Sequence, residues 1–344
     1  MAPDFLSLNI EELTEYVRSM GWPAFRAKQI FDWLHKKHTV DITAMKNLPG
    51  EIRECLKEGL YPMQELRCLT SKKDGTKKFL FGLRDGQAIE TVFMPSNYGH
   101  SLCISSQAGC RMGCSFCAST IGGLVRNLTP GEMLGQVYEA VNRTGERVDS
   151  IVVMGTGEPL DNYDNLLKFL HLISAPEGYN LSLRSITVSS CGLVPKIRSL
   201  AEEGLPITFA LSLHATTDEE RKNLMPVARS YSIKETLSAC QYYFDRTHRR
   251  VTFEYSLVKG VNDSEAHAER LSGLLRPLKG HVNLIPINPI DERDFQRGSD
   301  ESIRKFKFIL EKNGINVTIR RSMGSDIDAA CGQLRRKAGE ELRS

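Results

Sequence analysis

The chain has 344 residues, of which 41% are hydrophobic and 25% are charged, and its formal net charge is +3. This is the composition of a globular protein with a full core, and the length fits one large domain or a domain with an appendage. The sequence contains no long apolar run and opens on no basic stretch followed by an apolar one, so it predicts neither a membrane span nor a secretory signal. We therefore expect a cytoplasmic protein whose nine cysteines stay reduced and act as ligands, nucleophiles or core residues.

The first 65 residues are predicted to form a small helical accessory domain. Apolar residues recur on one helical face of segment 10–20, and Asn9 with Glu12 resembles a capping pair at its start. Segments 25–37 and 45–60 have similar mixed helical patterns.

Residues 66–95 change to short β-type runs that are broken by turn dipeptides. Asp74-Gly75 and Asp85-Gly86 are typical of tight hairpin turns. The sequence therefore predicts a β-hairpin extension in this segment.

From residue 96 the chain repeats a strand followed by a helix. The predicted strands are 101–106, 150–155, 185–190, 207–213, 251–258, 282–288 and 315–321. Strands that are almost continuously apolar and alternate with helices form parallel sheets covered by helices. Six or seven such units favour a full or partial (β/α) barrel over an open sheet. We therefore predict an α/β barrel core over 96–334 and a basic C-terminal tail over 335–344.

Three cysteines, Cys110, Cys114 and Cys117, lie in one short segment without a fourth cysteine nearby. They precede a predicted helix whose start is marked by Thr129 and Glu132 as a capping box. The cysteine segment is therefore a loop at the carboxyl end of a strand, where barrels carry active sites. Three thiolates on a four-iron cluster leave one iron open to a small chelating ligand. A zinc site with a distant fourth ligand and a set of buried reduced cysteines are the alternatives.

A glycine-rich turn follows the next predicted strand, in the stretch VVMGTGEPLDN. Glycine lets the backbone approach a ligand closely, here at Gly157, and the carboxylate of Glu158 could pair with the ammonium group of a ligand. The alternative is a tight β–α turn that binds nothing.

The cysteine spacing and this turn together resemble the radical S-adenosylmethionine (SAM) superfamily. Further stretches make the resemblance closer, because they occur in the order seen in the RlmN family of adenine-C2 RNA methyltransferases. They include IETVFMP, SLCISSQAGC, MGTGEPLDNYDN, FALSLHATTDEERKNLMP, IPINP and DIDAACGQL. The match spans residues 20–334 and uses several independent motifs. It implies a partial (β/α)6 barrel with a small N-terminal helical domain.

The resemblance also implies a cofactor set and a reaction. Cys110, Cys114 and Cys117 would hold one [4Fe–4S] cluster, with SAM on the open iron. One SAM would methylate Cys331, and a second would supply the radical that joins this methyl carbon to adenine C2. Cys103 would then release the product by forming a disulfide with Cys331.

The resemblance implies one further catalytic residue, Glu90, and leaves four cysteines without a catalytic role. Glu90 matches the proton acceptor proposed for the family, and its alternative is a solvent-exposed hairpin carboxylate. Without the resemblance, Cys103 and Cys331 would be read as small buried hydrophobic residues. The remaining cysteines are predicted to be structural: Cys55, Cys68, Cys191 and Cys240.

The SAM-binding positions of the family fall at the ends of predicted strands. They are Gly157, Glu158, Ser189, Ser212, Leu213, His214 and Asn288. Without the resemblance, serines and asparagines at strand ends would be read as caps or turn formers. His214 is interpreted as a SAM or backbone contact, because no second histidine lies at metal-ligand spacing.

The resemblance implies 23S rRNA and tRNA as substrates, and a flavodoxin or a ferredoxin as electron donor. The protein is expected to be a monomer. Basic stretches that could contact RNA phosphates occur at 71–78, 247–250, 318–322 and 334–339, although each is also typical of a solvated face.

Two other functions remain open at this point. Cfr-type enzymes methylate adenine C8, and Pro159 after Gly-Glu favours the C2 family over them. Residues 323–326 read Met-Gly-Ser-Asp, however, where the C2 family usually has Arg-Gly-Asp-Asp. The second alternative is an RNA-binding factor that holds a cluster and transfers no methyl group. The presence of both Cys103 and Cys331 argues against it.

Overall fold

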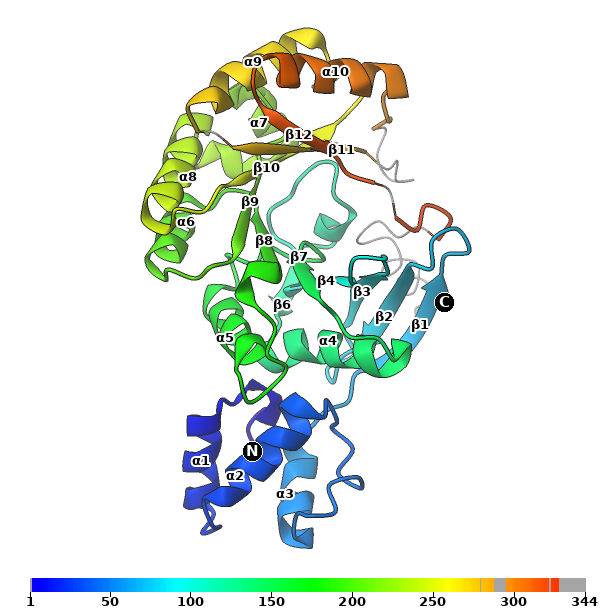
Figure 1. Ribbon diagram of the computed structural model, residues 1–344, viewed down its shortest axis with the longest axis vertical. Coiled ribbons are helices and arrows are strands. Elements are labelled where there is room, and N and C mark those ends of the chain that lie inside the picture. Colours follow the sequence, from blue (N-terminus) through cyan, green and yellow to red (C-terminus); the bar gives the residue numbers. More distant parts are fainter. Residues whose placement is uncertain (1, 279, 288–294, 322, 328–344) are drawn as a thin grey trace.

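The computed structural model describes residues 2–278, 280–287, 295–321 and 323–327. Its main feature is a sheet of ten strands in the described part of the chain (Figure 1). In order along this sheet the strands are β1 (Gln64–Thr70), β2 (Lys77–Gly82), β3 (Ala88–Met94), β4 (Ser101–Ile104), β7 (Ser150–Val153), β8 (Ile186–Ser190), β9 (Thr208–Ser212), β10 (Thr252–Leu257), β11 (His281–Pro286) and β12 (Asn316–Ile319). A separate small sheet pairs β5 (Gln107–Gly109) with β6 (Leu124–Asn127).

From β4 onward, neighbouring strands of the large sheet are parallel. The helices that connect them are α4 (Pro130–Thr144), α5 (Tyr163–Ser174), α6 (Val194–Glu202), α7 (Asp218–Leu224), α8 (Ile233–Thr247), α9 (Glu265–Leu275) and α10 (Asp300–Lys312). The described residues thus form six strand–helix units followed by β12, with the helices along the outer side of the sheet (Figure 1). The predicted partial (β/α)6 barrel is confirmed. None of the helices in the described residues combines the length and apolar character that a membrane crossing requires.

The segment before the barrel forms three antiparallel strands, where the sequence predicted one hairpin. β1 pairs with β2, β2 with β3, and β3 with β4. Gly75 and Gly86 have φ angles of 74° and 80° in the two turns, as the Asp-Gly dipeptides predicted. Because β3 pairs directly with β4, the extension continues the barrel sheet instead of standing apart from it.

Side chains on the parallel strands alternate between the covering helices and the barrel interior. In β8, Ile186 and Val188 are buried, whereas Thr187 and Ser189 are partly accessible. The strand β11 alternates in the same way. Since successive side chains of a strand point to opposite faces, the apolar set packs under the helices and the polar set lines the interior.

The N-terminal helices are α1 (Ile10–Ser19), α2 (Phe25–Phe31) and α3 (Gly50–Gly59), and they form a lobe below the sheet in Figure 1. Asn9 and Glu12 form the predicted capping box at the start of α1. His35 is fully buried, and its Nδ1 lies 3.0 Å from the hydroxyl of Tyr138 in α4. The lobe therefore packs directly against the barrel.

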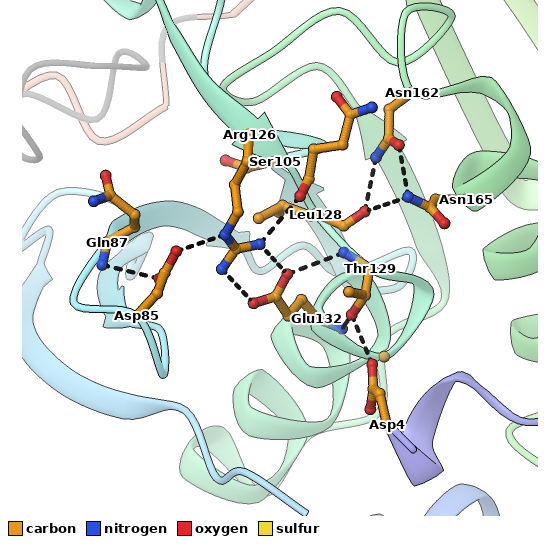
Figure 2. A network of polar contacts seen from close by, with 12 residues as sticks. Asp4, Asp85, Gln87, Ser105, Arg126, Leu128, Thr129, Glu132, Asn162 and Asn165 are labelled. Atoms are coloured by element: carbon orange, nitrogen blue, oxygen red, sulfur yellow. Dashed lines mark hydrogen bonds and ion pairs between the residues drawn. The ribbon is translucent and has the colours of Figure 1, made fainter. Parts of the chain in front are cut away.

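A polar network joins this lobe to the start of α4 (Figure 2). The Thr129 hydroxyl accepts a hydrogen bond from the Glu132 N–H at 3.1 Å and donates one to Asp4 at 2.7 Å. Arg126 donates two hydrogen bonds to the Glu132 carboxylate, at 2.7 and 2.8 Å, and a third to Asp85 at 2.6 Å. These hydrogen bonds hold the first turn of α4 to three other parts of the chain, namely the N-terminal lobe, the β2–β3 turn and β6.

We expect Thr129→Ala to lower the free energy of unfolding by about 1 kcal/mol, the usual cost of losing a helix-capping hydroxyl. Thr129→Ser keeps the hydroxyl and is the matched control, which should remain close to the unsubstituted protein. Urea denaturation of both variants measures the difference. Equal stability of the alanine and serine variants would show that this cap does not hold α4.

Candidate active site

The three cysteines lie in the loop between β5 and β6. At its base, the Cys110 N–H donates to the Gly123 carbonyl at 3.0 Å. In its middle, the Ser115 N–H donates to the Leu224 carbonyl at 2.9 Å. The second bond ties the loop to the last turn of α7, so that the loop is fixed at two points.

Two of the three cysteines are buried, and Cys117 is partly exposed. Cys110 is 7% exposed and Cys114 is 8% exposed. Burial raises the pKa of Cys110 to about 12, and it also raises the pKa of Cys114, with a further contribution from the neighbouring thiols Cys117 and Cys110. Such thiols remain protonated until a metal replaces their protons, since a coordinating thiol is deprotonated outright.

A zinc ion and an iron–sulfur cluster place different geometric demands on the three cysteines. Among the described residues, no three His, Cys, Asp or Glu side chains converge closely enough to hold a single metal ion. A zinc ion would draw its sulfur ligands to about 2.3 Å from one centre. An iron–sulfur cluster takes each thiolate on a different iron, and so it accepts ligands that do not meet at one point.

The cysteine loop borders a cavity of about 220 Å³. The predicted site residues that line it are Cys110, Cys114, Cys117, Gly157, Glu158, Ser189, Ser212 and His214. They come from the loop and from the carboxyl ends of β7, β8 and β9. The cavity thus brings the cysteines together with most of the positions predicted to bind SAM.

The turn after β7 packs its backbone against β5. Gly157 has a φ of 108°, and a Cβ atom there would lie 2.5 Å from the Cβ of Gln107. Only glycine fits this conformation and this space. The Gln107 side chain accepts a hydrogen bond from the Glu158 N–H at 2.8 Å, which fixes the turn beside the base of the cysteine loop.

The carboxylate of Glu158 is 4% exposed and lies in the cavity wall. It accepts hydrogen bonds from the Leu160 N–H at 3.1 Å and from the Cys191 N–H at 2.8 Å. Burial raises the pKa of Glu158, and the bond from Cys191 acts in the opposite direction. A ligand ammonium group would offset the cost of burying this charge.

His214 lines the cavity as a neutral ring. Its Nδ1 accepts a hydrogen bond from the Ser256 N–H at 2.9 Å, which leaves the proton on Nε2. Burial lowers the pKa of His214 to about 3. The ring packs edge-on against Phe116, in the cysteine loop, with the ring centres 4.9 Å apart.

Of the predicted site residues that the structure describes, Leu213, Cys103 and Glu90 do not line this cavity. Leu213 is fully buried in the main hydrophobic core, and its N–H donates to the Glu254 carbonyl at 3.0 Å. Asn288 and Cys331 lie outside the described residues.

Cys103 and Glu90 lie on adjoining strands and face the barrel interior. Cys103 is opposite Val92, and Glu90 shares a face with Val92 because it lies two residues earlier on the same strand. The Glu90 carboxylate is 2% exposed and lies 3.1 Å from the Lys78 ammonium, which is 0% exposed. The alternative of a solvent-exposed hairpin carboxylate is therefore wrong.

Residues 323–326, which include the departure from the family pattern, are held by the β1–β2 turn. Asp74 accepts a hydrogen bond from the Gly324 N–H at 2.8 Å, and the Ser71 hydroxyl donates to Asp326 at 2.6 Å. The turn belongs to a basic stretch that the sequence offered as an RNA contact. In the structure it anchors the segment that leads toward position 331.

Sequence reasoning missed several residues of the cavity. Cys191, predicted to be structural, lines it beside Glu158. Its place directly after a predicted strand was the available signal, because barrel ligands bind at that end. Glu254 and Arg320 also line the cavity. A charged residue inside the apolar run VTFEYSLV was the signal for Glu254.

A larger cavity, of about 540 Å³, lies where the N-terminal lobe, the β2–β3 turn and α4 meet. The two cavities have no described lining residue in common. The smaller one holds the three cysteines and the buried carboxylate. Its chemistry, and not its size, makes it the candidate site.

Comparison with known proteins identifies the family. The chain matches the Radical SAM superfamily over residues 104–271 and the ribosomal RNA large subunit methyltransferase N-terminal domain over residues 3–61. A probable dual-specificity RNA methyltransferase RlmN from Lachnoclostridium phytofermentans is 57% identical, over 97% of this chain and 94% of that protein. This chain belongs to the RlmN family. A second relative with the same name, from Geobacillus kaustophilus, is 50% identical over 98% of this chain and 94% of its own length.

A solved structure agrees with this assignment to the RlmN family. A radical SAM methyltransferase from Sphaerobacter thermophilus superposes with a TM-score of 0.93 at 45% identity, covering 96% of this chain and 98% of that one. The resemblance seen in the sequence motifs is thereby confirmed, together with the radical SAM fold. Membership of this superfamily implies a [4Fe–4S] cluster and SAM as cofactors.

His214 should make stability depend on pH below neutrality. Its folded pKa of about 3 lies below the ordinary value of 6.5. Its contribution to stability is therefore complete above pH 6.5 and is lost as the pH falls toward 3. Between about pH 7 and about pH 5, we expect the unsubstituted protein to lose about 2 kcal/mol more unfolding free energy than His214→Asn, measured by urea denaturation.

His248→Asn is the matched control, because it removes an exposed histidine of the same barrel. This variant should lose as much stability between the two pH values as the unsubstituted protein does. If His214→Asn loses that amount as well, the ring of His214 is not held neutral by burial.

Proposed function

We propose that this RlmN family member methylates C2 of an adenosine in 23S rRNA and in tRNA, using two SAM molecules per turnover. The observation that carries the proposal is the meeting of the loop cysteines, Glu158 and His214 around one cavity. It occurs in a chain that is similar, over 97% of its length, to a protein named as a dual-specificity RNA methyltransferase.

Different residues of the cavity would bind the two cofactors, the cluster and SAM. Cys110, Cys114 and Cys117 would hold the cluster, and the Glu158 carboxylate would take the SAM ammonium while Gly157 lets the backbone approach. Adenine C2 lies between two ring nitrogens and is not nucleophilic, so the bound cluster and SAM supply radical chemistry in place of direct displacement.

Two cysteines would act on the methyl group, Cys331 as its carrier and Cys103 in its release. The Cys331 thiolate takes a methyl group from one SAM and becomes a thioether. This methyl carbon would lose one hydrogen atom to the radical that the second SAM supplies and would bond to adenine C2. The adduct would then give up the C2 proton and return one electron to the bound cofactor, which restores the aromatic ring.

The Cys103 thiolate then attacks the Cys331 sulfur. A disulfide bond forms, the bond from Cys331 sulfur to the methyl carbon breaks, and that carbon takes up a proton. Two electrons from a thiol reductant return the disulfide to two thiols before the next turnover.

Glu90 would take the proton that leaves C2. Its carboxylate is buried and paired with Lys78 at 3.1 Å, on the interior face that also carries Cys103. The Lys78 ammonium offsets the cost of burying an ionised carboxylate where water is excluded. Glu90 is thus a base on the same face as the proposed nucleophile.

The remaining parts of the proposal concern the partners of the protein. The target base would leave its stack to enter the barrel, and the basic stretches 247–250 and 318–322 would contact the RNA phosphates. A flavodoxin or a ferredoxin would supply the electron for the cluster. We place the reaction in the cytoplasm, where ribosomal and transfer RNA are found, and expect the protein to act as a monomer.

The C2 target is favoured over C8 by the relatives, which carry the RlmN name, and by Pro159 after Glu158. The departure at residues 323–326 does not leave that segment without support, because the β1–β2 turn binds it. We therefore propose that this departure is a local variation within the C2 family.

Cys103→Ala should accumulate a covalent adduct between Cys331 and RNA, because the attack that releases the base is lost. A denaturing gel with radiolabelled RNA detects the adduct as a slowly migrating band. Cys331→Ala should give no adduct and no transfer of methyl label from SAM to RNA.

Cys68→Ala is the matched control, since it removes an exposed cysteine on β1. It should turn over like the unsubstituted protein. Normal turnover by Cys103→Ala without an adduct would contradict its proposed role. A Cys331 peptide that carries no methyl group in anaerobically purified protein would favour the RNA-binding factor instead.

A further inference from the structure

Arg221, in the middle of α7, is the largest fully buried side chain among the described residues. Its Nη2 donates to the Cys191 carbonyl at 2.7 Å and to the Ser212 carbonyl at 3.3 Å, and its Nε donates to the Leu213 carbonyl at 3.2 Å. These carbonyls lie at the carboxyl ends of β8 and β9. The guanidinium therefore sits behind the wall of the cysteine cavity, between two strand ends.

This buried cation has no carboxylate partner in the described part of the chain. All of its hydrogen bonds there go to backbone carbonyls, and its Nη1 is buried without a hydrogen-bond partner. Buried charges in proteins are normally paired with an opposite charge or with a metal site. Asp218, one turn earlier on the same helix, acts on the guanidinium electrostatically, but no described carboxylate forms a hydrogen bond with it.

The cysteine loop lies close enough to bring further negative charge to Arg221 when its thiols bind a metal. One turn after Arg221, the Leu224 carbonyl accepts the hydrogen bond from Ser115 in the cysteine loop. Cys114, Cys191 and Leu224 pack together in one buried cluster. The guanidinium also interacts electrostatically with the thiols of Cys191 and Cys114. The same helix therefore holds the loop and brings a positive charge against it.

We propose that Arg221 is the counter-ion of the iron–sulfur cluster and makes the cluster easier to reduce. Its two anchored nitrogens fix the guanidinium, and the Nη1 N–H is left for the anionic cluster or its thiolate ligands. Each electron that enters a thiolate-bound cluster adds negative charge, which a fixed cation in a water-poor site stabilises. Arg221 is a positioning residue that touches no substrate. The inference rests on the proposed ligands Cys110, Cys114 and Cys117.

The test compares the midpoint potential of the reconstituted cluster in three variants, by anaerobic redox titration with electron paramagnetic resonance (EPR) detection. Arg221→Gln removes the charge, and we expect the equilibrium constant for one-electron reduction to fall about tenfold, a shift of about 59 mV to more negative potential. Arg221→Lys keeps the charge and should stay close to the unsubstituted protein. Lys222→Gln removes an exposed cation next along the same helix and should leave the potential unchanged.

Equal potentials in Arg221→Gln and the unsubstituted protein would overturn the proposal. Equal shifts in Arg221→Gln and Arg221→Lys would also overturn it, because the role would then be purely structural. Production of 2-methyladenosine by the unsubstituted protein tests the proposed function separately. A protein that makes none can still show the dependence of the potential on this charge.

If Arg221→Gln takes up no cluster, a second measurement tests whether the Arg221 guanidinium lies beside the cluster. It uses an Arg111→Lys/Arg320→Lys double variant, since Arg320 also lines the cavity and Arg111 adjoins Cys110. With ¹⁵N in the arginine guanidinium groups, pulsed EPR of the reduced cluster should detect nitrogen coupling from Arg221. Absence of that coupling would overturn the proposal.

Discussion

The buried carboxylate of Glu158 is the constraint on which the site depends. A charge in this place must be hydrogen-bonded, and the groups that bind the side chain and the backbone of Glu158 come from separate parts of the barrel. The Cys191 N–H at the end of β8 donates to its carboxylate, and Gln107 of β5 accepts from its backbone N–H. The Gln107 N–H in turn donates to the Thr156 carbonyl in the turn after β7, at 3.1 Å. The carboxyl ends of β7 and β8 and the start of β5 are thus held in one arrangement, and the cysteine loop follows directly after β5.

Side chains alternate along the strands, so the residues that stabilise the fold lie on one face of the sheet and the residues of the site lie on the other. Residues such as Val188 pack under the outer helices, while Ser189 and Ser212 on the other face line the interior. Because all parallel strands end at the same rim, these interior side chains meet the cysteine loop there. The antiparallel extension adds a second part of the interior face, where the side chains are fully buried. Lys78 and Glu90 form an ion pair there, on the neighbouring strands β2 and β3, and β3 pairs with β4.

Features that depend on a few neighbouring residues could be predicted from the sequence. The capping boxes at Asn9 and Thr129 and the seven core strands are of this kind. The strand β1 has no apolar alternation, because most of its side chains are exposed, and its pairing with β2 was indicated by the Asp74-Gly75 turn alone. Helix α7 is too short for a clear apolar pattern, and it is stabilised by its cap and by its bond to the cysteine loop. Arg221 lies within the charged run DEERK of this short helix, and such a run is typical of a solvent-exposed surface. Its burial could therefore not be predicted. The place of Cys191 directly after a predicted strand indicated the barrel rim, but its contact with Glu158 depends on how β7 and β8 pair, which the sequence does not reveal.

The central claim is that the cysteine cavity directs a methyl group to adenine C2. The most direct measurement is nucleoside mass spectrometry of 23S rRNA and tRNA treated with the reconstituted protein, SAM and a reductant. Authentic 2-methyladenosine and 8-methyladenosine serve as chromatographic standards. We expect 2-methyladenosine in both RNAs. Formation of 8-methyladenosine, or of no methylated adenosine by protein that carries a full cluster, would contradict the claim.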